Sequence, residues 1–169
     1  MQKHTRFLLT AGAAFLCSFL IVRFVIFNGY IPSESMLPKY QVGDRIVCNR
    51  LAYLLSDPDR YDVVVFHAPD SGETYIKRIM GLPGETIHIK NGKIYINGNE
   101  IADPNANESW GQGEDMTFRI PEDSYFMMGD NRNHSYDARY WNNHFVKKED
   151  IIAKAGFRYY PIKNMGFLY

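Results

Sequence analysis

Ser33 and Ser35 are the side chains best suited to nucleophilic chemistry, because they lie two residues apart in the short segment of residues 31–38. In an extended segment, side chains two residues apart point to the same side. One hydroxyl group would then attack a substrate while the other donates a hydrogen bond. Taken alone, a Pro-bounded, Ser-rich linker is the simpler interpretation of this composition.

Lys77 is the candidate base. It lies in an apolar run, residues 74–80, where the alternation of a β-strand would turn its side chain inward. Burial disfavours the charged form of an amine and lowers its pKa. A buried lysine is therefore able to accept a proton near neutral pH. For any single lysine, an edge-strand position that faces water is the simpler interpretation.

The third polar segment, residues 128–139, follows an apolar run and is expected to lie against the core. Its Gly-Asp-Asn start is typical of a strand that enters a turn. Buried polar groups need partners, and Asp137 is expected to pair with Arg132 or Arg139. A solvated polar loop would be the preferred interpretation if this segment stood alone.

The elements that must position these residues are mainly β-strands. Alternation on both sides of Asn91-Gly92 predicts a hairpin, and Asn97-Gly98 predicts another tight turn. A short helix is expected at residues 147–152 and a polar surface loop at residues 102–116. The other strands are expected at residues 45–49, 62–67, 74–80, 117–120, 124–128 and 154–159.

An apolar stretch, residues 7–27, precedes this body and contains a single charge, Arg23. As a helix it would span about 31 Å, roughly the thickness of the hydrocarbon core of a bilayer. The stretch just after it, residues 28–35, has no convincing small-x-small cleavage site, and the apolar run is long for a signal peptide, which favours a retained anchor over a cleaved signal peptide. A buried core helix is a weaker alternative, because the rest of the chain contains no matching helices.

The charges indicate the orientation of this anchor. Lys3 and Arg6 precede it without any acidic residue, so the positive-inside rule places residues 1–6 in the cytoplasm. Residues 28–169 then form one extracytoplasmic, β-rich domain. The expected fold class is a compact antiparallel β domain on one N-terminal transmembrane helix.

Composition excludes several classes of protein. The chain has 169 residues, 46% of them hydrophobic, and a net charge of zero, so a basic surface for nucleic acid is not expected. Cys17 lies in the apolar stretch, far from Cys48, and no disulfide framework is predicted. The spacing of histidines and cysteines matches no metal-binding motif, so no metal and no cofactor are expected.

The three polar segments together resemble the type I signal peptidase family, also called leader peptidase. The resemblance lies in an S-x-S-M-x-P segment, a Y-I-K-R-x-x-G-x-P-G-E segment and a G-D-N-R-x-x-S-x-D-x-R segment, in this order behind an anchor. Glu34 departs from the family pattern, which often has glycine there. The segment from Trp141 to Val146 is longer than in the usual pattern.

The resemblance implies a role for each matching residue. Ser35 matches the nucleophile and Lys77 the general base. Ser33 matches a hydroxyl that assists the oxyanion hole, and Ser135 matches a serine that hydrogen-bonds and orients the lysine. Asp137 and Arg139 match a pair that braces the site. Met36 takes the place of a residue near the substrate pockets, and the supporting turn corresponds to Gly129, Asp130, Asn131 and Arg132.

The family's activity is the removal of N-terminal signal peptides from secreted preproteins after small residues at positions −1 and −3. The resemblance thus implies a serine endopeptidase in the plasma membrane, in contact with the lipid bilayer and close to the secretion translocon. An organelle inner-membrane peptidase remains an alternative location. Three other interpretations are a Ser-His-Asp enzyme that uses His134, a membrane-tethered binding module and a self-cleaving repressor. The last would carry a DNA-binding helix-turn-helix in place of the apolar helix.

Overall fold

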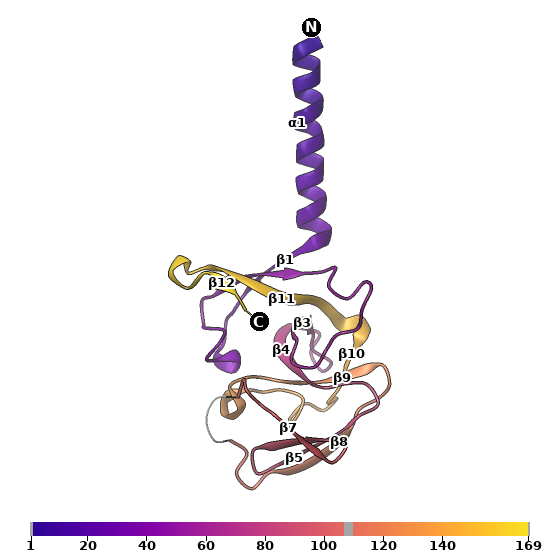
Figure 1. The fold of residues 1–169 in the computed structure, drawn as a ribbon, viewed down its shortest axis with the longest axis vertical. Coiled ribbons are helices and arrows are strands. Elements are labelled where there is room, and N and C mark those ends of the chain that lie inside the picture. Colours follow the sequence, from indigo (N-terminus) through magenta and orange to yellow (C-terminus); the bar gives the residue numbers. More distant parts are fainter. Residues whose placement is uncertain (1, 107–109, 169) are drawn as a thin grey trace.

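The computed structural model describes residues 2–106 and 110–168. A single apolar helix projects from a body of β-strands (Figure 1). Helix α1 (Gln2–Leu20) continues into a π-helical turn (Ile21–Val25). The stretch from Lys3 to Val25 is long and apolar enough to cross a membrane, and its most apolar window is not buried against the body.

The helix ends two residues earlier than predicted, because strand β1 (Ile26–Tyr30) begins directly after the π-helical turn. Ile26 pairs with Asn49 of strand β2, and the amide of Arg50 donates to the carbonyl of Val25 at 2.9 Å. The sheet thus satisfies the backbone groups that a longer helix would have used.

The body contains two antiparallel sheets, which confirms the predicted fold class. The larger sheet has the strand order β1-β2-β11-β3-β4-β9-β10, with β12 paired to β11. Its further strands are β2 (Arg45–Asn49), β3 (Val63–His67), β4 (Thr74–Gly81), β9 (Ser124–Met128), β10 (Val146–Lys147), β11 (Ile151–Tyr160) and β12 (Gly166–Phe167).

The smaller sheet has the strand order β7-β6-β5-β8. Its strands are β5 (Thr86–Lys90), β6 (Lys93–Ile96), β7 (Asn99–Ile101) and β8 (Asp115–Arg119). The two Asn-Gly turns join β5 to β6 and β6 to β7, as predicted. Asn91 and Gly92 both adopt positive φ, 48° and 76°, as the tight turn of a two-residue hairpin requires.

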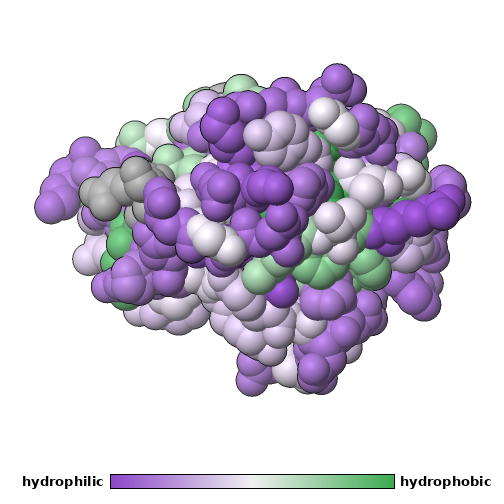
Figure 2. Space-filling model, turned by 90° about the horizontal axis from the view of Figure 1, so that it is seen from below, coloured by the Kyte–Doolittle hydropathy of each residue, from purple (hydrophilic) through white to green (hydrophobic). Residues whose placement is uncertain are grey.

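Strand β9 of the larger sheet packs against the smaller sheet, and all five of its residues are buried. Phe126 and Met127 belong to one apolar cluster that also contains Ile87 and Ile94 of the smaller sheet. Hydrophilic side chains cover most of the end of the molecule that is remote from α1 (Figure 2). The body therefore forms one unit with a shared core, and its polar end faces away from the apolar helix.

Two local predictions were confirmed only in part. Residues 147–152 contain only one 3-10 turn (Lys148–Asp150), since Val146 pairs with Tyr125 in β9 and Ile151 with Phe66 in β3. The expected surface loop at residues 102–116 includes Trp110, which is buried with a 4% exposed fraction. Residues 107–109 of this loop lie outside the described part of the chain.

Candidate active site

The serine segment follows β1 and forms a 3-10 turn (Glu34–Met36). Ser33 is extended, as expected, but Ser35 lies within the turn, so the predicted extended arrangement of both serines was wrong. The two hydroxyl groups still lie together, with 3.4 Å between the Oγ atoms. Met36 is completely buried in the core cluster beneath the turn and is not among the residues that line the cleft above it.

Lys77 lies on β4, where it pairs with Val64 of β3. Its side chain is turned inward, with a 5% exposed fraction, as the strand alternation predicted. Its Nζ donates a hydrogen bond to the Oγ of Ser35 at 2.5 Å. Burial lowers the pKa of Lys77 to about 8, while the negative charge of Asp137 acts in the opposite direction.

The third polar segment follows β9 and holds the serine turn in place. Asn131 donates its backbone amide to the carbonyl of Ser35, and its side-chain amide to the carbonyl of Glu34, both at 3.1 Å. A Cβ atom added at Gly129 would overlap the Oγ of Ser135 and the carbonyl oxygen of Ser35. Only glycine allows so close an approach between this segment and the turn.

Two buried ion pairs hold the third polar segment in place. Asp130 accepts two hydrogen bonds from Arg78, at 2.7 and 2.6 Å. Asp137 accepts one from Nε of Arg139 at 2.9 Å and one from the amide of Gly129 at 2.9 Å. Of the two partners predicted for Asp137, the structure thus selects Arg139. All four charged side chains are buried, which makes such fixed pairs strong constraints on geometry.

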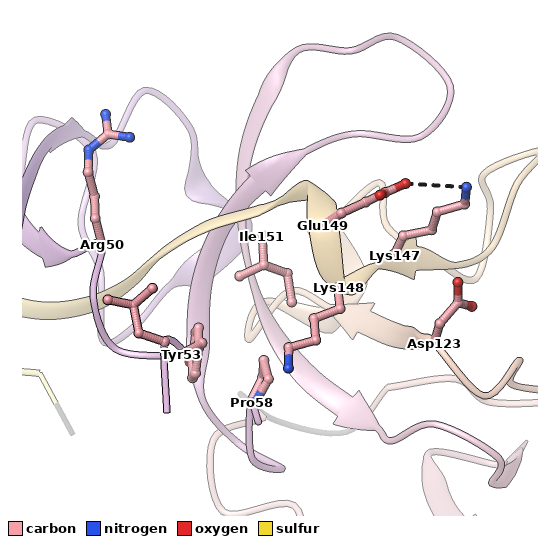
Figure 3. A pocket seen from close by; sticks show the side chains of 9 residues that line it. Arg50, Tyr53, Pro58, Asp123, Lys147, Lys148, Glu149 and Ile151 are labelled. Atoms are coloured by element: carbon pink, nitrogen blue, oxygen red, sulfur yellow. Dashed lines mark hydrogen bonds and ion pairs between the residues drawn. The ribbon is translucent and has the colours of Figure 1, made fainter. Parts of the chain in front are cut away.

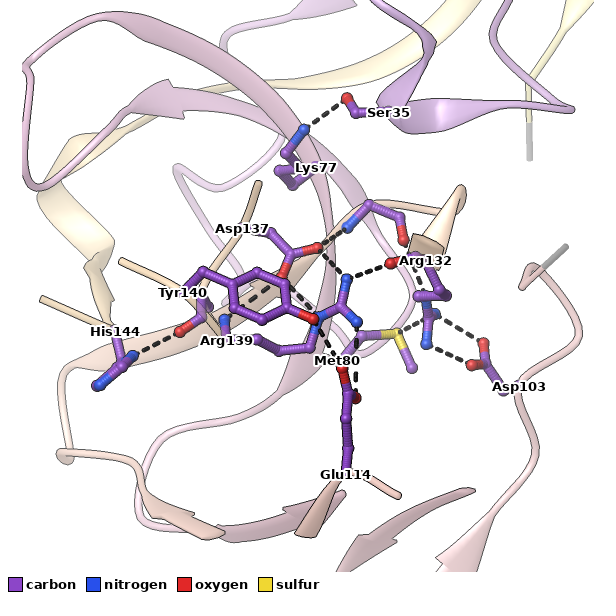
Figure 4. Close-up of polar contacts among 12 residues, drawn as sticks. Ser35, Lys77, Met80, Asp103, Glu114, Arg132, Asp137, Arg139, Tyr140 and His144 are labelled. Atoms are coloured by element: carbon purple, nitrogen blue, oxygen red, sulfur yellow. Dashed lines mark hydrogen bonds and ion pairs between the residues drawn. The ribbon is translucent and has the colours of Figure 1, made fainter. Parts of the chain in front are cut away.

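Sequence analysis missed Asp103, which pairs with Arg132. The Nη1 and Nη2 atoms of Arg132 donate to the two carboxylate oxygens of Asp103, the second at 2.8 Å (Figure 4). The two residues lie far apart in the sequence, on either side of β8 and β9. An unmatched arginine in the third segment was the only available signal.

Ser135 does not make the hydrogen bond that was predicted for it. Its side chain is buried, yet its Oγ atom has no hydrogen-bond partner among the residues that the structure describes. The hydroxyl group packs against Gly129. In this structure the orientation of Lys77 depends on its strand and on its contact with Ser35.

A cleft of about 620 Å³ opens above the Ser35–Lys77 pair. Strand β1 and the start of β4 line it together with the serine turn. The apolar part of the cleft lining comes mainly from Ile31, Ile46, Val65 and Ile76. Polar groups also line it, on the side chains of Glu73, Tyr75, His134 and Tyr136. The pair therefore lies within reach of a ligand that enters between two strands.

A second hollow, of about 500 Å³, lies between the loop after β2 and the start of β11 (Figure 3). Its lysines are paired, Lys147 with Glu149 at 3.4 Å and Lys148 with Asp57, and its lining has no serine, cysteine or histidine. Within residues 2–106 and 110–168, His, Cys, Asp and Glu side chains form no group of three that could hold a metal ion. The first cleft is therefore the candidate active site.

The chemistry of this site follows from its pair of groups. A hydroxyl group becomes a strong nucleophile when an adjacent base removes its proton. A lysine whose pKa lies near 8 is partly neutral in neutral solution, so it is able to act as that base. The site is thus equipped for attack on a carbonyl carbon and for transfer of an acyl group.

The known proteins that are similar to this chain are peptidases. The family model described as "Signal peptidase, peptidase S26" matches residues 4–160. "Signal peptidase I" of Leptolyngbya laminosa is 37% identical, over 94% of this chain and 81% of the relative. "Signal peptidase I" of Bacillus caldolyticus is 34% identical, over 90% of each chain. The crystal structure of a signal peptidase I from Enterococcus faecalis is 32% identical, with a TM-score of 0.52, covering 59% of this chain and 97% of that chain.

Proposed function

The chain belongs to the signal peptidase family, peptidase S26, and we propose that it removes signal peptides from preproteins with Ser35 as nucleophile and Lys77 as general base. The contact of 2.5 Å between Lys77 Nζ and Ser35 Oγ is the observation that carries this proposal. Both side chains are buried at the floor of the cleft, where water competes poorly for the base.

The first step is acylation. Neutral Lys77 accepts the hydroxyl proton of Ser35, and Oγ attacks the carbonyl carbon of the scissile peptide bond. The oxyanion that forms would receive hydrogen bonds from the backbone N–H of Ser35 and the hydroxyl group of Ser33. The 3.4 Å between the two serine Oγ atoms supports this placement of Ser33. Each such donor contributes about 2.7–4 kcal/mol to the stability of the transition state.

The second half of the reaction restores the enzyme. The ammonium group of Lys77 returns its proton to the leaving amine, so that the new N-terminus departs and an ester on Ser35 remains. Water then enters, Lys77 again accepts a proton, and the ester is hydrolysed. Asp137 and Arg139 hold the third segment against Lys77 throughout, and Gly129 to Arg132 hold the serine turn.

The cleft also supports the proposed substrate class. An extended peptide would lie between the edge of β1 and the start of β4, and it would add to the sheet through backbone hydrogen bonds. Ile31, Ile46 and Ile76 give the cleft an apolar lining, which would take the small side chains at the −1 and −3 positions of a preprotein.

The apolar helix supports a membrane-anchored form. We propose that residues 1–6 lie in the cytoplasm, that the helix crosses the plasma membrane once, and that the β body lies outside, near the secretion translocon. The structure differs from the predicted anchor, residues 7–27, at both ends, since the helix already begins at Gln2 and since Ile26 and Phe27 lie in β1. The family match decides against a tethered binding module and a self-cleaving repressor.

The test is cleavage of a preprotein that carries an Ala-x-Ala site by the full chain in detergent. We expect one cut after the −1 residue, identified by the N-terminal sequence of the product. The matched control is the same preprotein with tryptophan at −1, which should resist cleavage because the proposed site takes small side chains there. No cleavage of several such preproteins by folded protein would refute the proposed function.

The pH dependence of kcat/KM provides a second test. Because the pKa of Lys77 is lowered to about 8, the rate should rise about tenfold per pH unit in acid and level off near pH 8. A base with an ordinary histidine pKa, about 6.5, would level off more than one unit earlier. That result would favour His134, which also lines the cleft, over Lys77.

A further inference from the structure

The charges beneath the active site do not balance within the three polar segments. These segments bury three guanidinium groups, on Arg78, Arg132 and Arg139, but only the two carboxylates of Asp130 and Asp137. Asp130 pairs with Arg78 and Asp137 with Arg139. Arg132 has a 1% exposed fraction and would be left with its charge unmatched, which is costly in a dry interior.

Asp103 supplies the missing carboxylate from another part of the fold. It lies just after β7, on the connection to β8 in the smaller sheet, and both of its oxygens accept from Arg132. Arg132 also donates to the carbonyl of Gly129 at 2.8 Å, and its own carbonyl accepts from Arg139 at 2.7 Å. Arg132 thus connects Asp103 to the residues that surround Asp137.

Trp110 lies on the same connection, and its ring packs against the guanidinium groups of both Arg132 and Arg139. Its ring lies 5.1 Å from the guanidinium carbon of Arg132 and 5.3 Å from that of Arg139. Such cation–π contacts are strongest when the groups are desolvated, and Trp110 is buried. One indole ring therefore fixes the spacing between the two arginines.

The hairpin of the smaller sheet supports Trp110 from behind. A Cβ atom added at Gly92 would overlap the carbonyl oxygen of Trp110, so the turn and the tryptophan backbone are in close contact. Asn91 accepts a hydrogen bond from the amide of Gly113 at 3.1 Å, and its own amide donates to Glu114. The smaller sheet thus holds the connection to β8 at Trp110 and on its C-terminal side.

We propose that Asp103 and Trp110 are positioning residues for the Ser35–Lys77 site. They hold Arg132 and Arg139 at a fixed spacing, and they thereby keep the carboxylate of Asp137 beside Lys77. Figure 4 shows Asp137 between Lys77 and Arg139, with Arg132 and Asp103 beyond. The inference rests on the proposed function, because it assigns this support to the same reaction.

Loss of this support would have two separate effects. Asp137 and Lys77 would lose their fixed positions, which lowers kcat, and the pKa of Lys77 would change for an electrostatic reason. Loss of the charge on Asp103 leaves Arg132 free to compete with Arg139 for Asp137. It also removes one negative charge from the surroundings of Lys77. Both changes disfavour the ammonium form and therefore lower the pKa of Lys77. The other groups that face this lysine are Asp130 and Arg139 from the third segment, Tyr75 from its own strand, and Glu73 and His134 in the cleft lining.

The experiment compares Asp103→Asn and Trp110→Ala with the wild type in full-length, detergent-solubilised protein. We expect kcat to fall about tenfold in each variant while KM changes less than about twofold, because the cleft itself is intact. In Asp103→Asn the acid limb of the pH profile should move to lower pH by about half a unit. Asp103→Glu should recover most of the loss.

Glu100→Gln is the matched control, because Glu100 is an exposed carboxylate of the smaller sheet that pairs with the exposed Lys93, at 3.0 Å. Its kcat and pH profile should equal those of the wild type. Wild-type kcat and an unmoved acid limb in folded Asp103→Asn would overturn the inference. An equal loss in Glu100→Gln would also overturn it, since the effect would then be general to the sheet.

A measurement without substrate separates this inference from the proposed function. The pKa of Lys77 is read from the ¹³Cε signal of lysine-labelled protein, assigned by its absence in Lys77→Met. A lower pKa in Asp103→Asn supports the positioning role even if the wild type cuts no preprotein. An unchanged pKa together with an active wild type would refute the positioning role and leave the peptidase assignment intact.

Discussion

Replacing Lys77 with methionine is expected to reduce cleavage of an Ala-x-Ala preprotein by a factor on the order of 10³ or more. Methionine is close to lysine in length and fits an apolar strand, but it has no group that removes the proton of Ser35. The contact of 2.5 Å between Nζ and Oγ is then lost. Single-turnover rates with excess enzyme measure the chemical step directly.

The same substitution should make the fold more stable at neutral pH. The pKa of Lys77 is about 8 in the folded chain and 10.5 in the unfolded chain. Between these values the unfolded chain binds more protons, so wild-type stability rises with pH there, and below pH 8 the cost of the buried charge is complete. The gain from Lys77→Met, at most about 3 kcal/mol, should therefore shrink from pH 8 upward.

Urea unfolding at several pH values measures this gain. Lys90→Met, at an exposed lysine that pairs with Asp115 at 3.1 Å, is the control and should change neither activity nor stability appreciably. Substantial cleavage by folded Lys77→Met would contradict the assignment of the base. Loss of activity together with loss of stability would mean that Lys77 supports the fold and is not a base held there at a cost.

Ser35→Ala is expected to have the largest effect, a loss of cleavage on the order of 10⁶-fold. The substitution removes the oxygen that accepts the 2.5 Å hydrogen bond from Lys77 Nζ at the floor of the cleft. Alanine leaves the 3-10 turn intact, because the turn is held through backbone carbonyls that accept from Asn131. Binding of the preprotein should therefore survive, and a pull-down measures it.

Ser33→Ala is the matched control for this prediction, since it removes a neighbouring hydroxyl group but leaves the Ser35–Lys77 contact. We expect a loss of about 10²–10³-fold, the usual effect of one oxyanion donor. If Ser33→Ala abolished cleavage while Ser35→Ala kept it, the two serines would have exchanged roles. Full activity in Ser35→Ala would rule out covalent catalysis by this residue.

The parts of the fold that sequence analysis predicted depend on local signals. Asn91-Gly92 and Asn97-Gly98 specify tight turns by their backbone preferences, and alternation predicted that Lys77 faces inward. The short helix expected at residues 147–152 is limited to Lys148–Asp150, because the charged residues there reflect surface exposure and carry no information about Val146 or Ile151. Those two residues are committed to strands by partners in β9 and β3.

The candidate site was predictable only in part, for the same reason. The three segments were expected to converge, and the structure brings Ser35, Lys77 and the third segment together. The pairing of Arg132 with Asp103 has no local signal, because ion pairs between distant segments depend on how two sheets pack. Ser135 shows the converse limit, since a motif position does not fix which rotamer its hydroxyl group adopts.

The direct passage from α1 into β1 determines where a preprotein can be cut. The strand that leaves the helix also forms one wall of the cleft, so only a short segment joins the helix to Ser35, the proposed nucleophile. Ser35 lies nine positions after Ile26, and a fully extended chain of that length reaches about 30 Å at most. With α1 across the bilayer as proposed, Ser35 would reach only peptide bonds that lie close to the membrane surface. The enzyme would select bonds by their height as well as by their side chains, and similar sites deep within a folded, exported domain would be out of reach.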